Sequence, residues 1–188
     1  MVTITKMRSK ENEILELFFN SSKHWHFEEM LKKVKIGRPQ LTRWLRVFQK
    51  EGIIKRVKKK GKMPYYVHDF YNPKFDIRKK LYARQILASS GLLDHLASLK
   101  KAKVIILFGS FSRSDWYNHS DIDIFIYGRD DDFEQGKYEL KLHRDIQVHT
   151  AKDKKDLKRI DKMLPYIISG DYIKGSIQDL GVEVYAKT

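Results

Sequence analysis

The chain has 188 residues, no cysteine and a formal net charge of +14 at pH 7. The absence of cysteine excludes disulfides, zinc–thiolate sites and thiol catalysis, and it agrees with a cytoplasmic setting. No apolar run approaches the ~18 residues of a membrane span and no secretory start is evident, so we expect no membrane partner. The length accommodates two small domains and excludes an elaborate polymerase.

The positive charge is concentrated in the first part of the chain. Residues 1–70 hold 17 Lys and Arg against 7 Asp and Glu, a net charge of +10, whereas residues 71–188 hold 21 against 17, a net charge of +4. We therefore predict an N-terminal domain over 1–70 and a second domain over 71–188, of which 71–102 forms linking helices. The expected fold class is mixed α+β.

Three helices are predicted in the N-terminal domain. Apolar residues recur at helical spacing after a cap at Ser9, again from Phe27, and a third time after Pro39, which suits a first helical position. Gly52 supplies a stop for the third helix. The three expected core faces are Ile14, Leu17 and Phe18; Phe27, Met30, Leu31 and Val34; and Leu41, Leu45 and Phe48.

A hairpin follows, with strands over 53–57 and 63–67 and a basic tip between them. Three helices and a hairpin resemble a winged helix-turn-helix domain, over roughly residues 8–70. The resemblance implies that the third helix enters a major groove while the wing contacts flanking phosphates. The residues it assigns to nucleic acid are Arg38, Gln40, Thr42, Arg43 and Arg46 on the helix, and Lys58, Lys59, Lys60 and Lys62 on the wing.

Duplex DNA is the expected ligand of this domain, and RNA stays open as an alternative. Two other interpretations compete with nucleic-acid binding. Winged helices also serve as protein–protein modules, and lysine runs are commonly solvated surface.

The second domain opens with helices and then a strand. Pro73 begins a helix that runs toward Ser90, Gly91 interrupts it, and a further short helix precedes the apolar run over 104–108. That run is short and unbroken, which predicts a strand buried on both faces. Gly109 and Ser110 fall where the strand ends and a helix could begin, a place where backbone N–H groups favour anions.

Two carboxylates follow at a fixed distance. Asp121 and Asp123 alternate with isoleucines, so a strand over 121–126 points both carboxylates to one face. Adjacent carboxylates repel each other unless a cation sits between them. A solvated edge strand after a common Gly-Ser turn is the simpler alternative.

An apolar strand, Gly-Ser, ten intervening residues and Ser-Asp-x-Asp resemble the minimal form of the polymerase-beta-like nucleotidyltransferases, over roughly residues 75–188. The chain departs from that pattern at Ser114, where glycine is frequent. The resemblance implies a small mixed sheet and transfer of a nucleoside monophosphate from an NTP, with ATP as the expected donor and two Mg²⁺ ions. It assigns Gly109, Ser110, Arg113 and Ser120 to the nucleotide, and Asp121 and Asp123 to metal and catalysis.

The resemblance also implies a third acidic ligand from a later strand. Over 144–150 the alternation places Asp145 on one face with Gln147 and His149, and we choose Asp145 as metal ligand and general base. A shift in strand register would leave Gln147 at the third position and weaken the catalyst.

The remaining segments carry less chemistry. Asp130, Asp131 and Asp132 are predicted to begin a loop or a helix after the second strand, and to act as a cap rather than as metal ligands. Helices are expected over 153–163 and 165–169, and a last strand over 182–185.

Two functions remain open. The first is a metal-dependent nucleotidyltransferase that acts on a protein or nucleic-acid acceptor, and minimal members of the family include antitoxins that modify a partner toxin. The second is a DNA-binding regulator, or an antitoxin-like protein, whose nucleotidyltransferase fold has little or no catalysis. In so short a chain the region that binds the acceptor must be small. A protein partner or a second copy of the chain could complete it.

Overall fold

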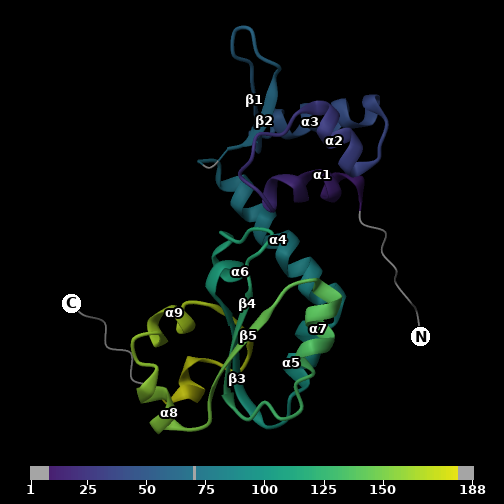
Figure 1. The fold of residues 1–188 in the computed structure, drawn as a ribbon. Coiled ribbons are helices and arrows are strands. Elements are labelled where there is room, and N and C mark those ends of the chain that lie inside the picture. The colour runs from purple at the N-terminus through teal and green to yellow at the C-terminus, as the bar shows by residue number, and fades with distance from the viewer. Residues whose placement is uncertain (1–8, 70, 182–188) are drawn as a thin grey trace, which may run out of the picture. The chain divides into compact units, whose positions relative to one another are not determined.

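The computed structural model describes residues 9–69 and 71–181. The chain divides into two compact units, Met1–Tyr82 and Ala83–Thr188 (Figure 1). The division falls inside one helix, α4 (Pro73–Ser90), whereas the predicted domain boundary lies after residue 70. In the described part of the chain, no helix combines the length and the apolar character that a membrane span requires.

The first unit contains three helices and a two-stranded antiparallel hairpin, in the predicted order. Ser9 caps the first helix as predicted, because its hydroxyl accepts the backbone N–H of Asn12 at 3.2 Å. The element order is that of a winged helix-turn-helix, and the assignment itself stays a prediction. The bounds are α1 (Lys10–Phe19), α2 (Phe27–Val34), α3 (Arg38–Lys50), β1 (Ile54–Val57) and β2 (Tyr65–His68).

The start of α4 packs into the core of the first unit. Phe19 is buried, and its ring centroid lies 5.4 Å from that of Phe75 and 5.4 Å from that of Tyr82. Arg78 joins α4 to α1 and α3 through ion pairs with Glu11 and Glu51. The first half of α4 therefore belongs to this unit, which explains why the division falls within the helix.

Most of the predicted core residues of the three helices are buried, and a few are displaced. Phe27, Leu17 and Leu31 are only half-buried, while Leu15 and Phe19 are buried instead. The apolar face of α1 is wider than predicted because this helix packs against α4 as well as α2.

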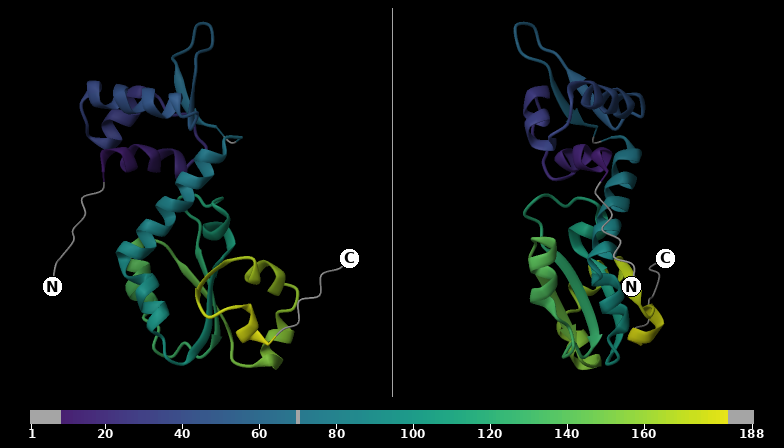
Figure 2. Two further views of the ribbon diagram at one scale, coloured as in Figure 1. Left: turned by 180° about the vertical axis from the view of Figure 1, so that it is seen from behind. Right: turned by 90° about the vertical axis from the view of Figure 1, so that its right-hand side faces the viewer.

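The second unit is built on a four-stranded sheet of order β5-β4-β3-β6. β3 pairs antiparallel with β4 and β6, and β5 pairs parallel with β4, which makes the sheet mixed as predicted. Helices α5 and α7 cover one face, and α8 and α9 cover the other (Figures 1 and 2). The bounds are α5 (Leu92–Ser98), β3 (Ala102–Phe108), α6 (Gly109–Arg113), β4 (Ile122–Gly128), α7 (Gln135–Leu142), β5 (Ile146–Ala151), α8 (Lys154–Arg159), α9 (Leu164–Ile168), β6 (Asp171–Lys174) and the 3₁₀ turn η1 (Ile177–Leu180).

The predicted strand over 104–108 lies at the centre of this sheet and is buried on both faces, as expected. The side chains of its neighbour β4 point alternately to the two faces of the sheet. Phe125 and Tyr127 pack on the face that contains Leu157 of α8 and Ile167 of α9. Ile124 and Ile126 point to the opposite face, because successive side chains of a strand alternate.

Two predictions about the later segments need correction. Asp130, Asp131 and Asp132 cap no helix, because α7 begins only at Gln135 with Glu134 at its N-cap. Asp130 instead accepts the hydroxyl of Thr150 at 3.0 Å. The helix expected over 153–163 ends at Arg159.

The fourth strand of the sheet was not predicted. It is β6, at Asp171–Lys174, whereas the strand predicted over 182–185 lies outside the described residues.

Candidate active site

The turn from β3 into α6 brings the Gly-Ser pair against the carboxylates. Gly109 has φ +69°, and a Cβ atom added to it would lie 2.0 Å from Oδ2 of Asp123. Only glycine combines a left-handed backbone with so close an approach. Antiparallel pairing of Phe108 with Asp123 holds the two segments together. The structure thus brings Gly109, which the resemblance assigns to the nucleotide, together with Asp123, which it assigns to the metal.

Asp121 and Asp123 project from the start of β4 to one face, the face of Phe125. Asp121 directly precedes the strand, and both residues are half-buried. Burial raises the pKa of the Asp123 carboxyl, and the charge of Asp121 raises it further, while His149 and Arg113 act in the opposite direction. Ionised Asp123 is therefore held in an environment that favours a nearby cation.

The register of β5 decides where the third candidate lies. Ile146 pairs with Ile122 and Gln147 pairs with Asp123, so Gln147 is the strand neighbour of Asp123. Asp145 precedes the strand, and its carbonyl accepts the backbone N–H of Ile122 at 2.9 Å. Asp145 consequently lies beside Asp121 at the strand ends, on the same face.

Gln147 was predicted at this place only as a replacement for Asp145 at the third position. Its side-chain amide donates to Oδ2 of Asp121 at 2.5 Å. The alternation over 144–150 placed Gln147 on the correct face, but only the register shows which carboxylate it contacts. Arg144 was missed altogether, because no periodicity marks a residue that contacts main-chain carbonyls and aromatic rings of a distant segment.

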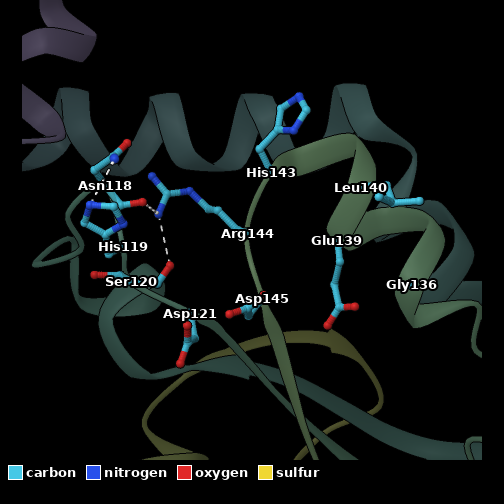
Figure 3. A pocket seen from close by; sticks show the side chains of 10 residues that line it. All are labelled: Asn118, His119, Ser120, Asp121, Gly136, Glu139, Leu140, His143, Arg144 and Asp145. Carbon is cyan, nitrogen blue, oxygen red and sulfur yellow. Dashed lines mark hydrogen bonds between the residues drawn. The ribbon is translucent and has the colours of Figure 1, made fainter.

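A pocket of about 670 Å³ opens beside Asp121 and Asp145 (Figure 3). It is lined by the segments that lead into β4 and β5, and by α7, which contributes Gly136, Glu139 and Leu140. Gly109, Ser110 and Asp123 do not line it. Of the two carboxylates of the Asp-x-Asp strand, Asp121 lines the pocket and Asp123 contacts Gly109 instead.

The remaining predicted nucleotide residues have local partners. The Oγ atom of Ser120 accepts the backbone N–H of Tyr117 at 2.8 Å and closes a turn. Arg113 is exposed and forms an ion pair with Asp115 at 3.0 Å. Ser114 ends α6 with φ 70°, a left-handed conformation, which explains why glycine is frequent at this position of the family pattern.

The donor set fits Mg²⁺, although it is not assembled. In residues 9–69 and 71–181, no three acidic or histidine side chains form a ready metal centre. Asp121 and Asp123 nevertheless offer carboxylate oxygens, which are the ligands that Mg²⁺ prefers. Asp123 is crowded against Gly109 with no room for a larger side chain at that position, and Asp145 offers a third carboxylate next to Asp121.

The predicted nucleic-acid residues of the first unit are distributed over α3 and the hairpin. Gln40, Arg43 and Arg46 are exposed, as are Lys58, Lys59, Lys60 and Lys62, whereas Thr42 is half-buried. Arg38 differs from the others, because it donates to both oxygens of Glu28 at 2.7 and 2.8 Å and thus joins α3 to α2. It would have to leave this pair to reach a base.

Comparison with known proteins bears on the second unit. Residues 92–177 match the family model described as Polymerase beta, Nucleotidyltransferase. Searches of curated proteins and of solved structures gave no significant match. The matched segment contains the Gly-Ser turn and all three candidate carboxylates. The match supports the resemblance of residues 92–177 to a polymerase-beta-like nucleotidyltransferase domain.

Proposed function

We propose that the chain transfers a nucleoside monophosphate from an NTP, with ATP as the expected donor, to a hydroxyl group of a protein or nucleic-acid acceptor. The observation that carries the proposal is the contact between the Gly-Ser turn and the Asp-x-Asp strand, where Gly109 leaves no space beside Asp123. That packing places the turn that would bind phosphate against a carboxylate that would bind metal. Both lie in the segment that matches a nucleotidyltransferase family.

In the proposed reaction the acceptor oxygen attacks the α-phosphorus of the NTP. A new oxygen–phosphorus bond forms, the bond from the α-phosphorus to the bridging oxygen breaks, and pyrophosphate leaves. Asp145 takes the acceptor proton, because it lies exposed at the pocket edge within reach of an incoming group. Gly109 and Ser110 orient the triphosphate through backbone N–H groups and a hydroxyl.

Asp121 and Asp123 would hold Mg²⁺, with Asp145 as a third ligand. When bound, two such ions stabilise the attacking and leaving oxygens. Gln147 occupies one oxygen of Asp121 and leaves the other for a cation. A cation would stabilise ionised Asp123, because burial and the neighbouring charge of Asp121 raise the pKa of its carboxyl.

The test is transfer of label from α-phosphate-labelled NTPs. The full chain is incubated with each labelled NTP, Mg²⁺ and a native cell extract, and the labelled product is treated with protease or nuclease to identify the acceptor. We expect one labelled product that is lost when Mg²⁺ is chelated with EDTA. Absence of label from every NTP would contradict the proposal.

A second candidate function is a regulator with little catalysis. It is favoured by the Gln147 amide on Asp121 and by the absence, among the described residues, of three acidic or histidine side chains gathered as a metal centre. Such a protein would bind nucleotide or nucleic acid and transfer no label.

We further propose that the first unit is a winged helix-turn-helix that binds nucleic acid, with duplex DNA as the expected ligand. The exposed faces of α3 and the hairpin tip support this proposal, since they gather arginines and lysines with no acidic residue between Lys58 and Lys62. Phosphate contacts by such lysines give affinity without base preference.

Changing Lys58, Lys59, Lys60 and Lys62 to Ala is expected to weaken duplex binding and to reduce the slope of log K against log salt by about 3 to 4. The reason is that each phosphate contact releases about one counterion. Filter binding over a salt series measures the slope. The matched control changes four exposed lysines of the second unit, Lys152, Lys154, Lys155 and Lys158, which alters the net charge equally. Equal slopes for the two variants would refute the wing contact.

A further inference from the structure

One guanidinium group holds the loop that leads into the Asp-x-Asp strand. We call residues 116–120 the α6–β4 loop. Nη1 of Arg144 lies 2.8, 2.9 and 3.0 Å from the main-chain carbonyls of Tyr117, Asn118 and Ser120. Figure 3 shows Arg144 pointing toward Asn118 and Ser120 from across the pocket edge. A charged donor shared by three carbonyls fixes the curvature of this loop.

The guanidinium is itself held in place by two buried rings. It lies 5.2 Å from the ring of Phe111 and 5.2 Å from the ring of Trp116, and these rings stack on each other with centroids 5.2 Å apart. Cation–π contacts favour a planar guanidinium at such positions. Arg144 therefore approaches the loop in a preset orientation.

The loop ends at Ser120, so its position sets the position of Asp121. On the other side of Asp121, the backbone N–H of Ile122 donates to the carbonyl of Asp145 at 2.9 Å. Arg144 and Asp145 are consecutive residues. The main chain on both sides of Asp121 is thus attached to one dipeptide at the start of β5.

That dipeptide is anchored in turn by α7. The carboxylate of Glu139 accepts the backbone N–H of Ile146 at 3.1 Å, and the side-chain amide of Gln135 donates to the carbonyl of Ile146 at 2.9 Å. These contacts fix the start of β5 although it is an edge strand of the sheet. Arg144 therefore lies next to a strand whose first residue is hydrogen-bonded to α7 at both its N–H and its carbonyl.

We propose that Arg144 is a positioning residue, which holds Asp121 beside Asp145 by fixing the α6–β4 loop. The effect of Arg144 on transfer rests on the proposed function, whereas the effect of Arg144 on the loop does not. Arg144 touches neither nucleotide nor metal in this role. Loss of its contacts frees the loop and lets Asp121 move away from Asp145, which weakens cation binding.

The test compares Arg144→Met and Arg144→Lys with the native full-length chain. Methionine removes all donors, while lysine keeps the charge and lacks the planar fork. The matched control is Arg159→Met, which removes an exposed arginine paired with Asp156 on α8. Hydrogen exchange of the amides over 117–122 reports on the loop, and Mn²⁺ binding measured by electron paramagnetic resonance reports on the carboxylates.

We expect Arg144→Met to speed exchange over 117–122 by about tenfold, since loop hydrogen bonds open locally. We expect its Mn²⁺ affinity to fall about tenfold, as for other groups that orient metal ligands. Arg144→Lys should lie between the native chain and Arg144→Met, and Arg159→Met should match the native chain in both measurements.

Unchanged exchange in Arg144→Met would overturn the inference, and so would faster exchange with unchanged Mn²⁺ affinity. A native chain that binds no Mn²⁺ would overturn it as well. If Arg144→Met does not fold, the comparison of Arg144→Lys with the native chain decides by the same two measurements. A native chain that binds Mn²⁺ but transfers no label would refute the proposed function and leave the positioning role intact.

Discussion

Asp123→Asn is expected to lower nucleoside monophosphate transfer by about 10³-fold or more. The variant keeps the shape of the side chain and removes the charge that would hold Mg²⁺, and such charge stabilisation is worth several kcal/mol of the barrier. The same result is expected for Asp121→Asn. Transfer of label from α-phosphate-labelled ATP measures the effect.

The fold of both variants should survive, because asparagine keeps the shape of the aspartate side chain. Burial and the neighbouring Asp121 raise the pKa of the Asp123 carboxyl, so a neutral amide costs no more than the ionised group. Urea unfolding of the variants checks this. Asp131→Asn is the matched control, since Asp131 is exposed near the other end of β4 and pairs with Lys101 and Arg129. Label transfer that persists in either Asp121→Asn or Asp123→Asn would refute the assignment of the carboxylates.

The central part of the fold was predictable from local sequence patterns. The apolar run over 104–108 is too short for a buried helix and became the central strand β3. The alternation after Asp121 gave the face of both carboxylates correctly, because side-chain direction in a strand depends on parity alone.

The edge elements were harder to predict because their burial is weak. β6 is half-buried at all four positions, so no alternation marks it. α7 buries only Tyr138 and therefore shows no clear apolar stripe. For both elements tertiary pairing, rather than local pattern, decides the structure.

Most features of the site that could not be predicted from the sequence are contacts between distant segments of the chain. The Gln147 amide reaches Asp121 because β5 pairs parallel with β4 in one particular register. The close approach of Gly109 to Asp123 likewise depends on pairing between β3 and β4. Local patterns predicted the candidate residues of this site, and the strand register shows which of them are neighbours.

Ser114 illustrates how a departure from the family pattern can be tolerated. Its left-handed backbone costs roughly 1 to 2 kcal/mol relative to glycine. Its backbone N–H donates to the carbonyl of Ser110 and closes α6, and Trp116, two residues further on, is fully buried. Packing of the surrounding segment therefore holds the strained residue, and the turn is kept without glycine.

Gly109→Ala is expected to lower transfer by about 10²-fold, and it tests the contact on which the proposed function depends. The added methyl group would lie 2.0 Å from Oδ2 and 2.8 Å from Cγ of Asp123, so the carboxylate or the turn must move. Misplacement of a reacting group by about 1 Å costs about 10²-fold in rate. Metal affinity, measured with Mn²⁺, should fall together with the rate.

Gly91→Ala separates this displacement from backbone strain. Gly91 has φ +82°, and an added Cβ atom would meet no other atom within 4 Å. Both alanine variants should therefore lose about 1 to 2 kcal/mol of stability from the left-handed backbone. Only Gly109→Ala should lose metal affinity and transfer in addition, because only there does the methyl group displace a carboxylate. If the two variants retain equal activity, the packing of Gly109 against Asp123 has no functional role, and the turn serves only to connect β3 with α6.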